Sequence, residues 1–162
     1  MGNPMIGQQS SHEGRIANLG IQLPSVPTPF GSYVEALQTG NLLFLSGMLP
    51  VIDHKPAYVG WIGRELDAKA GRDAARTAAL SALAAAKNHL GSLDRVKRVV
   101  RLGVFMVTVD DFIDHPGVAD GASDLFRDVF GEEHMAVRSV IGVASLPLGV
   151  PIEIEATFEL KE

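Results

Sequence analysis

Acidic and apolar residues alternate near the C-terminal end of the sequence, in the stretch VPIEIEATFEL over residues 150–160. Successive side chains of a β-strand point to opposite faces, so this pattern predicts a strand with one apolar face and one face that carries Glu153, Glu155 and Glu159. Either the acidic face meets water, or one of its carboxylates lies in a pocket and takes part in acid–base chemistry there.

A second chemical candidate is Arg138, in the stretch HMAVRSVIGVASL. The residues around it are mostly small or apolar, and a guanidinium in such a strand needs a partner or must reach water. The functional alternative is a carboxylate receptor, because the planar fork of an arginine matches a carboxylate at two points. The residue types alone leave both interpretations open.

Other familiar sites lack their sequence signals. The five histidines show no pair at the helical spacing of metal ligands, and the chain has no cysteine. Ser46 is not within a G-x-S-x-G elbow, and GWIGRELDAKAG lacks the closing G-K-[ST] of a phosphate loop. We therefore expect no metal site, no cofactor and no serine-hydrolase triad.

Composition favours a single globular domain. The chain has 162 residues, of which 46% are hydrophobic and 20% are charged, enough to bury a core without disulfides. No apolar run is long enough to span a bilayer and no leader pattern opens the sequence, so we expect a cytoplasmic protein without a membrane partner.

The charge balance argues against nucleic acid as a partner. The formal net charge is −5, whereas binding to a phosphate backbone relies on clustered cations. The one basic cluster is RVKRVVR, and strict alternation would place Lys97 and Arg101 on one face of a strand and Arg98 on the other.

Periodicity predicts the elements that must position these residues. A short helix should end at Gly20, and a hairpin should span residues 32–47. A helix over 67–90 ends at Gly91, a strand covers 94–109, and a second helix is capped by Asp114. The stretches 136–146 and 151–160 flank Pro147, Leu148 and Gly149, which predicts a final antiparallel hairpin.

The predicted order of elements is two strands, a helix, a strand, a helix and two strands. This order favours an α+β fold of two layers, a mixed sheet with both helices packed on one face. The other face then has no cover within one chain, so we expect a closed oligomer.

Three stretches, GSYVEALQTGNLLFLSGMLP, GVFMVTVDDF and LFRDVFGEEHMAVRSVIGVASLPLGVPIEIEA, resemble the reactive-intermediate deaminase family, also called the YjgF-like or RidA family. The resemblance places one family domain at residues 28–162, after an N-terminal extension over 1–27. It implies a chorismate-mutase-like fold and a homotrimer with clefts between subunits. It also implies cofactor-free hydrolysis of imines and enamines such as 2-aminoacrylate to 2-ketoacids and ammonia.

The same resemblance implies roles for individual residues. Arg138 matches the arginine that binds the substrate carboxylate, and Glu153 matches the acid that positions the attacking water. Val140 stands where many members have a cysteine, whose backbone carbonyl a valine also supplies.

Three further substrate-binding positions match the family. Tyr33 corresponds to a tyrosine of the cleft wall. Ser46 and Gly47 correspond to the serine and glycine of an S-G-Q-x-P turn, in which Met48 replaces the glutamine.

The predicted final hairpin has a geometric consequence. It would pair Glu153 near Ala144, about six residues or roughly 20 Å along the strand from Arg138. One small substrate cannot bridge that distance, so we expect neighbouring subunits to bring the two residues together.

Three function classes follow. The first is a deaminase acting on carboxylate-bearing imines or enamines. The second is a noncatalytic binder of small carboxylate ligands in the same cleft. The third is an endoribonuclease or translation inhibitor, a label that the family often carries and that the net acidity disfavours.

Overall fold

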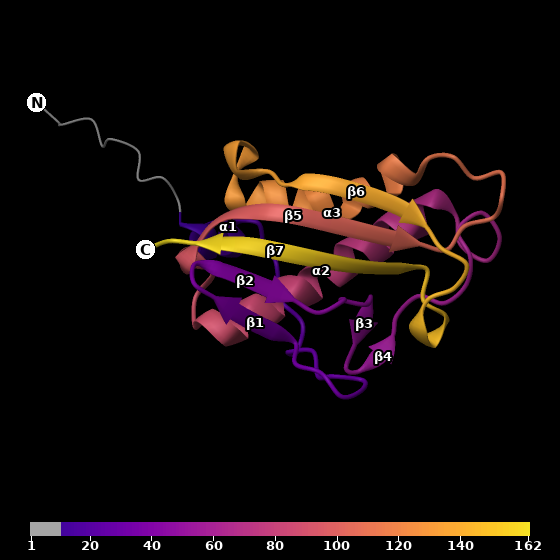
Figure 1. Ribbon diagram of the computed structural model, residues 1–162. Helices are drawn as coiled ribbons and strands as arrows, with labels where there is room; N and C mark the ends of the chain where they lie inside the picture. The colour runs from indigo at the N-terminus through magenta and orange to yellow at the C-terminus, as the bar shows by residue number, and fades with distance from the viewer. Residues whose placement is uncertain (1–10) are drawn as a thin grey trace, which may run out of the picture.

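The computed structural model describes residues 11–162, and the first ten residues of the predicted N-terminal extension lie outside this range. Figure 1 shows how the elements are arranged. The helices are α1 (His12–Asn18), α2 (Ala68–Leu90) and α3 (His115–Phe130). The strands are β1 (Ala36–Thr39), β2 (Leu42–Leu45), β3 (Val51–Ile52), β4 (Lys55–Pro56), β5 (Val96–Met106), β6 (Val137–Gly142) and β7 (Ile152–Leu160).

Five strands form one mixed sheet in the order β1-β2-β7-β5-β6. Neighbouring strands are antiparallel, except that β5 and β6 are parallel. Helices α2 and α3 pack against each other and lie together behind the sheet in the view of Figure 1. This arrangement confirms the predicted two-layer α+β architecture with both long helices on one face.

Local sequence signals explain where the long helices begin and how closely they pack. The side chains of Asp67 and Asp114 cap α2 and α3, as N-terminal carboxylates commonly do. The alanine-rich face of α2 is buried and lets the helix lie close to its neighbours. At Gly121 of α3, an added Cβ would collide with the carbonyl of Arg72, so only glycine permits this approach.

The predicted short helix is also present. It is α1, which ends at Asn18 and is followed by Gly20 with φ of 64°. Ile16 of α1 belongs to the main hydrophobic core, so the described end of the predicted extension packs against the rest of the chain.

The predicted C-terminal hairpin is wrong. Strands β6 and β7 do not pair with each other, because β5 lies between them. Residues 147–149 form a 3-10 turn with Leu148 at φ of 58°, within a longer connection that carries the chain past β5. Apolar periodicity identifies strands but does not say which strands pair, and β5 is apolar enough to lie inside the sheet between β7 and β6.

The corrected register still separates Arg138 from Glu153. On β5, Leu102 lies beside Arg138 and Phe105 lies beside Glu153, an offset of three residues. Together with two strand spacings, this places the two Cα atoms on the order of 14 Å apart. The two residues are therefore separated within one chain, but by less than the roughly 20 Å predicted and through a different strand pairing.

The predicted division of the basic cluster is also wrong. The Lys97 Nζ lies 3.0 Å from one carboxylate oxygen of Glu159, and the Arg98 Nε lies 3.6 Å from the other. Register shifts on both sides of this part of β5 break the strict alternation. Lys97 and Arg98 thus share one acid, which offsets part of their charge, whereas Arg101 donates to Ser139 Oγ.

The face of the sheet away from α2 and α3 carries both acidic and apolar side chains. Ile152 and Ile154 of β7 are buried toward the helices, so Glu153 and Glu155 point to the opposite face. Cross-strand neighbours Leu37 and Phe44 lie at the β1–β2 end and are exposed. Residues 11–162 provide no further layer over this face (Figure 1).

Candidate active site

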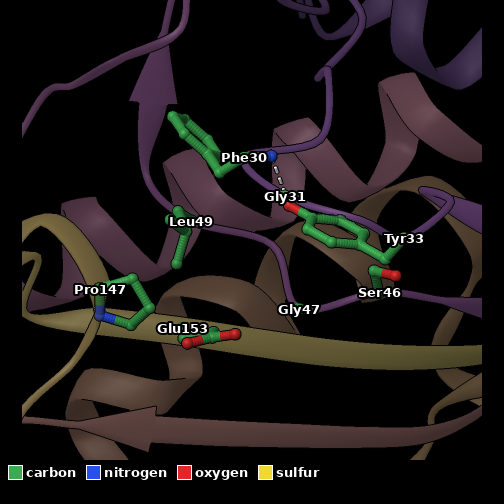
Figure 2. Close-up of a pocket in the computed structure, with 8 residues that line it drawn as sticks. All are labelled: Phe30, Gly31, Tyr33, Ser46, Gly47, Leu49, Pro147 and Glu153. Atoms are coloured by element: carbon green, nitrogen blue, oxygen red, sulfur yellow. Dashed lines mark hydrogen bonds between the residues drawn. The ribbon is translucent and has the colours of Figure 1, made fainter.

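A pocket of about 430 Å³ lies where the segment before β1, the β2–β3 connection and the start of β7 meet. Figure 2 shows its wall, with Glu153 on the β7 side and the two aromatic rings across from it. Its lining residues are Phe30, Gly31, Tyr33, Ser46, Gly47, Leu49, Pro147 and Glu153.

Glu153 supplies the acidic group of the pocket. Its carboxylate makes no hydrogen bond or ion pair with any residue in the range 11–162. Burial raises its pKa above the ordinary value, and the negative charge of Glu155 raises it further. A half-buried carboxylate with a raised pKa can exchange a proton nearer to neutral pH than a surface glutamate can.

Gly47 makes room for this carboxylate. A Cβ added at position 47 would lie 2.9 Å from the Cδ of Glu153 and would overlap Oε1. The glycine of the S-G turn is therefore required by the position of Glu153, which passes directly against the backbone.

The aromatic wall is held in place by hydrogen bonds and stacking. The Phe30 N–H donates to the Tyr33 hydroxyl at 2.9 Å, and the Phe30 ring stacks on His54 with centroids 3.9 Å apart. His54 occupies the β3–β4 turn, an element that the sequence analysis did not anticipate.

Ser46 plays a local structural part in this wall. Its hydroxyl donates to the Val34 carbonyl at 2.6 Å, and its backbone N–H donates to the Glu35 carbonyl at 2.9 Å. These bonds fasten the segment that carries Tyr33 to the β2–β3 connection. The hydroxyl is therefore engaged and is not poised as a nucleophile.

Arg138 and Val140 do not line this pocket. The Arg138 Nη1 donates to Asp120 Oδ1 at 2.7 Å and to Ser123 Oγ at 3.0 Å, both on α3. Val140 packs against the main core. Thus one chain brings together four of the six predicted site residues and keeps the arginine on the helix-covered side of the sheet.

The ion pair leaves much of the Arg138 guanidinium unused. Its remaining N–H groups make no hydrogen bond with residues 11–162, and its side chain keeps 25% of its accessible surface. A guanidinium has five N–H donors, so the group can hold Asp120 and still donate hydrogen bonds to a second carboxylate from its other edge.

Several lining residues were missed by the sequence analysis, namely Phe30, Gly31, Leu49 and Pro147. An apolar residue in a proline-punctuated segment carries no local signal for a pocket.

In residues 11–162, no three His, Asp or Glu side chains are grouped to hold a metal ion. Over the same range, no helix is both long and apolar enough to cross a membrane.

The sequence matches the profile of one protein family over residues 13–154, and the family is described as "YjgF/chorismate_mutase-like, putative endoribonuclease". The chain belongs to the YjgF/RidA family. The predicted resemblance and the chorismate-mutase-like fold are therefore confirmed.

Two curated relatives illustrate the range of this YjgF/RidA membership. Protein TCP17 of Trypanosoma cruzi is 42% identical over 152 residues, covering 91% of this chain and 95% of its own. A 2-iminobutanoate/2-iminopropanoate deaminase of Dermatophagoides farinae is 30% identical, covering 84% of this chain and 91% of its own.

Two solved structures of similar proteins show the same fold. Atu1372 of Agrobacterium tumefaciens, described as of unknown function, has a TM-score of 0.84 and 37% identity, covering 93% of this chain and 92% of its own. Escherichia coli TdcF with bound serine has a TM-score of 0.57 and 25% identity, covering 85% and 94%.

Proposed function

We propose that this protein hydrolyses the carbon–nitrogen double bond of reactive 2-imino acids, releasing a 2-ketoacid and ammonia. The observation that carries the proposal is the unpartnered, half-buried Glu153 in a pocket of about 430 Å³. Family membership and relatives named as deaminases at about 30% identity support the same reaction class.

Hydrolysis of an imine requires few groups from the protein. The carbon of a protonated imine is already electrophilic, so the site needs to hold the substrate and place one water about 3 Å from that carbon. Glu153 accepts a proton from the water as the carbon–oxygen bond forms. The same carboxyl then gives this proton to the nitrogen. As the carbon–nitrogen bond breaks and ammonia leaves, the hydroxyl passes its own proton to Glu153 and becomes the carbonyl oxygen, and transfer of that proton to ammonia or water restores the carboxylate.

The substrate carboxylate is assigned to Arg138 of a neighbouring subunit. Within one chain the pocket has a carboxylate and no lysine or arginine in its lining, whereas Arg138 has unused donors on β6, the edge strand of the sheet. A homotrimer that covers the open face of the sheet and sets the β6 edge of one subunit beside the pocket of the next would bring the Arg138 guanidinium and the Glu153 carboxylate into one cleft. It would also bury the exposed Leu37 and Phe44.

The serine bound to TdcF supports the proposed substrate class through the chemical groups that it carries. An amino acid carries a carboxylate next to a nitrogen, as a 2-imino acid does, and TdcF is similar to this chain over most of both sequences. We infer that amino acids can serve as unreactive stand-ins for the substrate in binding experiments.

The test is a coupled assay in which a pyridoxal-phosphate enzyme generates 2-aminoacrylate in situ and pyruvate release is followed. The wild-type protein should accelerate release, and Glu153→Gln should remove most of the acceleration because an amide cannot take up the proton. Glu132→Gln is the matched control, since Glu132 is exposed and lies outside the pocket. Binding of an amino acid without any acceleration would instead support the noncatalytic alternative.

A further inference from the structure

A second, smaller hollow adjoins the candidate active site. The two hollows share four wall residues, Phe30, Tyr33, Gly47 and Leu49. The smaller one is about 10 Å³ and therefore has room for about one water-sized group. Two polar residues on its wall, Glu35 and Ser81, have no part in the proposed hydrolysis.

Ser81 is an unsatisfied group at this place. Its side chain belongs to α2 and is 1% exposed, and its Oγ has no hydrogen-bond partner within the described part of the chain. Burying a hydroxyl without a partner is unfavourable, so most buried hydroxyls are paired. A polar group that enters the hollow would supply the hydrogen-bond partner that the Ser81 hydroxyl lacks.

Glu35 is a second polar residue of the hollow whose side chain has no partner within residues 11–162, and its carboxyl group can carry a charge. Its carboxylate is half-buried and makes no hydrogen bond or ion pair with residues 11–162. Burial raises its pKa, an effect that the charge of His54 opposes. His54 itself is engaged with Thr28 Oγ1 at 2.9 Å and with the Phe30 ring.

The lining of the two hollows contains no lysine or arginine, although it contains both Glu35 and Glu153. A carboxylate without a hydrogen bond or ion pair in a partly dry place favours a cation that donates hydrogen bonds. An ammonium group is close to a water molecule in size, it donates three hydrogen bonds, and a hydroxyl and a carboxylate can both accept from it.

We propose that the small hollow is a subsite for the cationic end of the substrate side chain, so that the preferred substrates are 2-imino acids with a basic side chain. This inference rests on the proposed function of the larger pocket. The backbone end of the substrate occupies the pocket beside Glu153, and the side chain passes the rings of Phe30 and Tyr33 to reach Glu35 and Ser81. The volume of about 430 Å³ also exceeds what a three-carbon imino acid requires.

The subsite is tested by equilibrium binding of three amino acids to the full-length protein by calorimetry. Lysine carries the terminal ammonium, norleucine matches its chain without the charge, and alanine reaches only the larger pocket. Lysine should bind about tenfold or more tightly than norleucine, as expected for a charge-assisted hydrogen bond to a partly buried carboxylate. The Glu35→Gln variant should bring that ratio close to one while leaving the affinity for alanine unchanged.

Two further variants separate the subsite from a general effect. Ser81→Ala should reduce the lysine preference by a smaller factor, and Glu132→Gln should leave it as in the wild type. The inference is overturned if lysine binds no better than norleucine, or if the preference survives in Glu35→Gln. It is also overturned if Glu35→Gln weakens lysine and alanine equally, because that result would mean a structural role.

These outcomes are distinct from those of the hydrolysis assay. Turnover of 2-aminoacrylate without any lysine preference would uphold the proposed function and sink the subsite. A lysine preference that depends on Glu35, found in a protein that turns over neither 2-aminoacrylate nor the 2-imino acid of lysine, would uphold the subsite as a binding site and refute the hydrolysis.

Discussion

Replacing Gly47 by alanine should disable the site by displacing Glu153. The added Cβ would lie 2.9 Å from the Glu153 Cδ, whereas ordinary contacts begin at 3.4 Å, and it would overlap Oε1 outright. The carboxylate must therefore swing away by on the order of 1 Å, and a displacement of that size can reduce a rate by about 100-fold. We expect kcat/KM in the 2-aminoacrylate assay to fall by about that factor.

The substitution should leave the fold almost unchanged. Gly47 has an ordinary negative φ, and the atoms that an added Cβ meets belong to the end of a flexible side chain. The urea midpoint of Gly47→Ala should therefore stay close to that of the wild type, which serves as the control for folding.

A double-mutant cycle shows whether Gly47 acts through Glu153. In a Glu153→Ala background, the Gly47→Ala change should have little further effect on kcat/KM, because the displaced group is already absent. A loss of similar size in both backgrounds, or wild-type activity of Gly47→Ala, would refute the steric reasoning.

Three other predictions follow from the same geometry. Arg138→Lys should lower kcat/KM by about 10- to 100-fold, because an ammonium cannot make the two-point contact with a carboxylate; an unchanged rate would remove the anchor assignment. Burial raises the pKa of Glu153 in the folded state above its ordinary value of 4.5, so its charged form costs stability as the pH rises past that value. Glu153→Gln should accordingly match the wild type in urea unfolding at about pH 4 and be more stable at about pH 7, and an equal difference at both pH values would contradict this. Ser81→Ala should raise the unfolding free energy by about 1 kcal/mol, since it removes an unpaired buried hydroxyl; a clear loss of stability would show that Ser81 has a partner.

Half of the pocket lining could be predicted from the sequence, by two different routes. Period-two alternation marks Glu153 on the polar face of β7, whereas Tyr33, Ser46 and Gly47 were expected only because they match positions of the family. Both helices of the covered face could be predicted as well, since Asp67 and Asp114 are capping residues ahead of periodic apolar segments.

Strand pairing could not be predicted, because it depends on contacts distant in sequence. The stretch around Leu148 has the composition of a hairpin turn, yet β5 inserts between the two strands it connects. Bulges had the same effect on the basic cluster, where Lys97 and Arg98 meet at Glu159. No periodic sequence pattern predicts which strands pair or where a bulge interrupts the alternation.

It also could not be predicted from the sequence that Glu35 and Ser81 line a hollow. Ser81 lies in the middle of an alanine-rich helix, where a serine has no local meaning, and Glu35 reads as a polar residue at the start of a strand. Their lack of partners becomes evident only when the segment before β1 is packed against α2.

The most direct test of a site shared between subunits is the activity of mixed oligomers. Arg138→Ala and Glu153→Ala subunits should each be inactive alone in the 2-aminoacrylate assay. After dissociation and reassembly at an equal ratio, about a quarter of the clefts should combine an intact Arg138 with an intact Glu153 and regain activity. If mixed oligomers form, as judged by native mass spectrometry, and remain as inactive as either parent, the two residues do not meet between subunits.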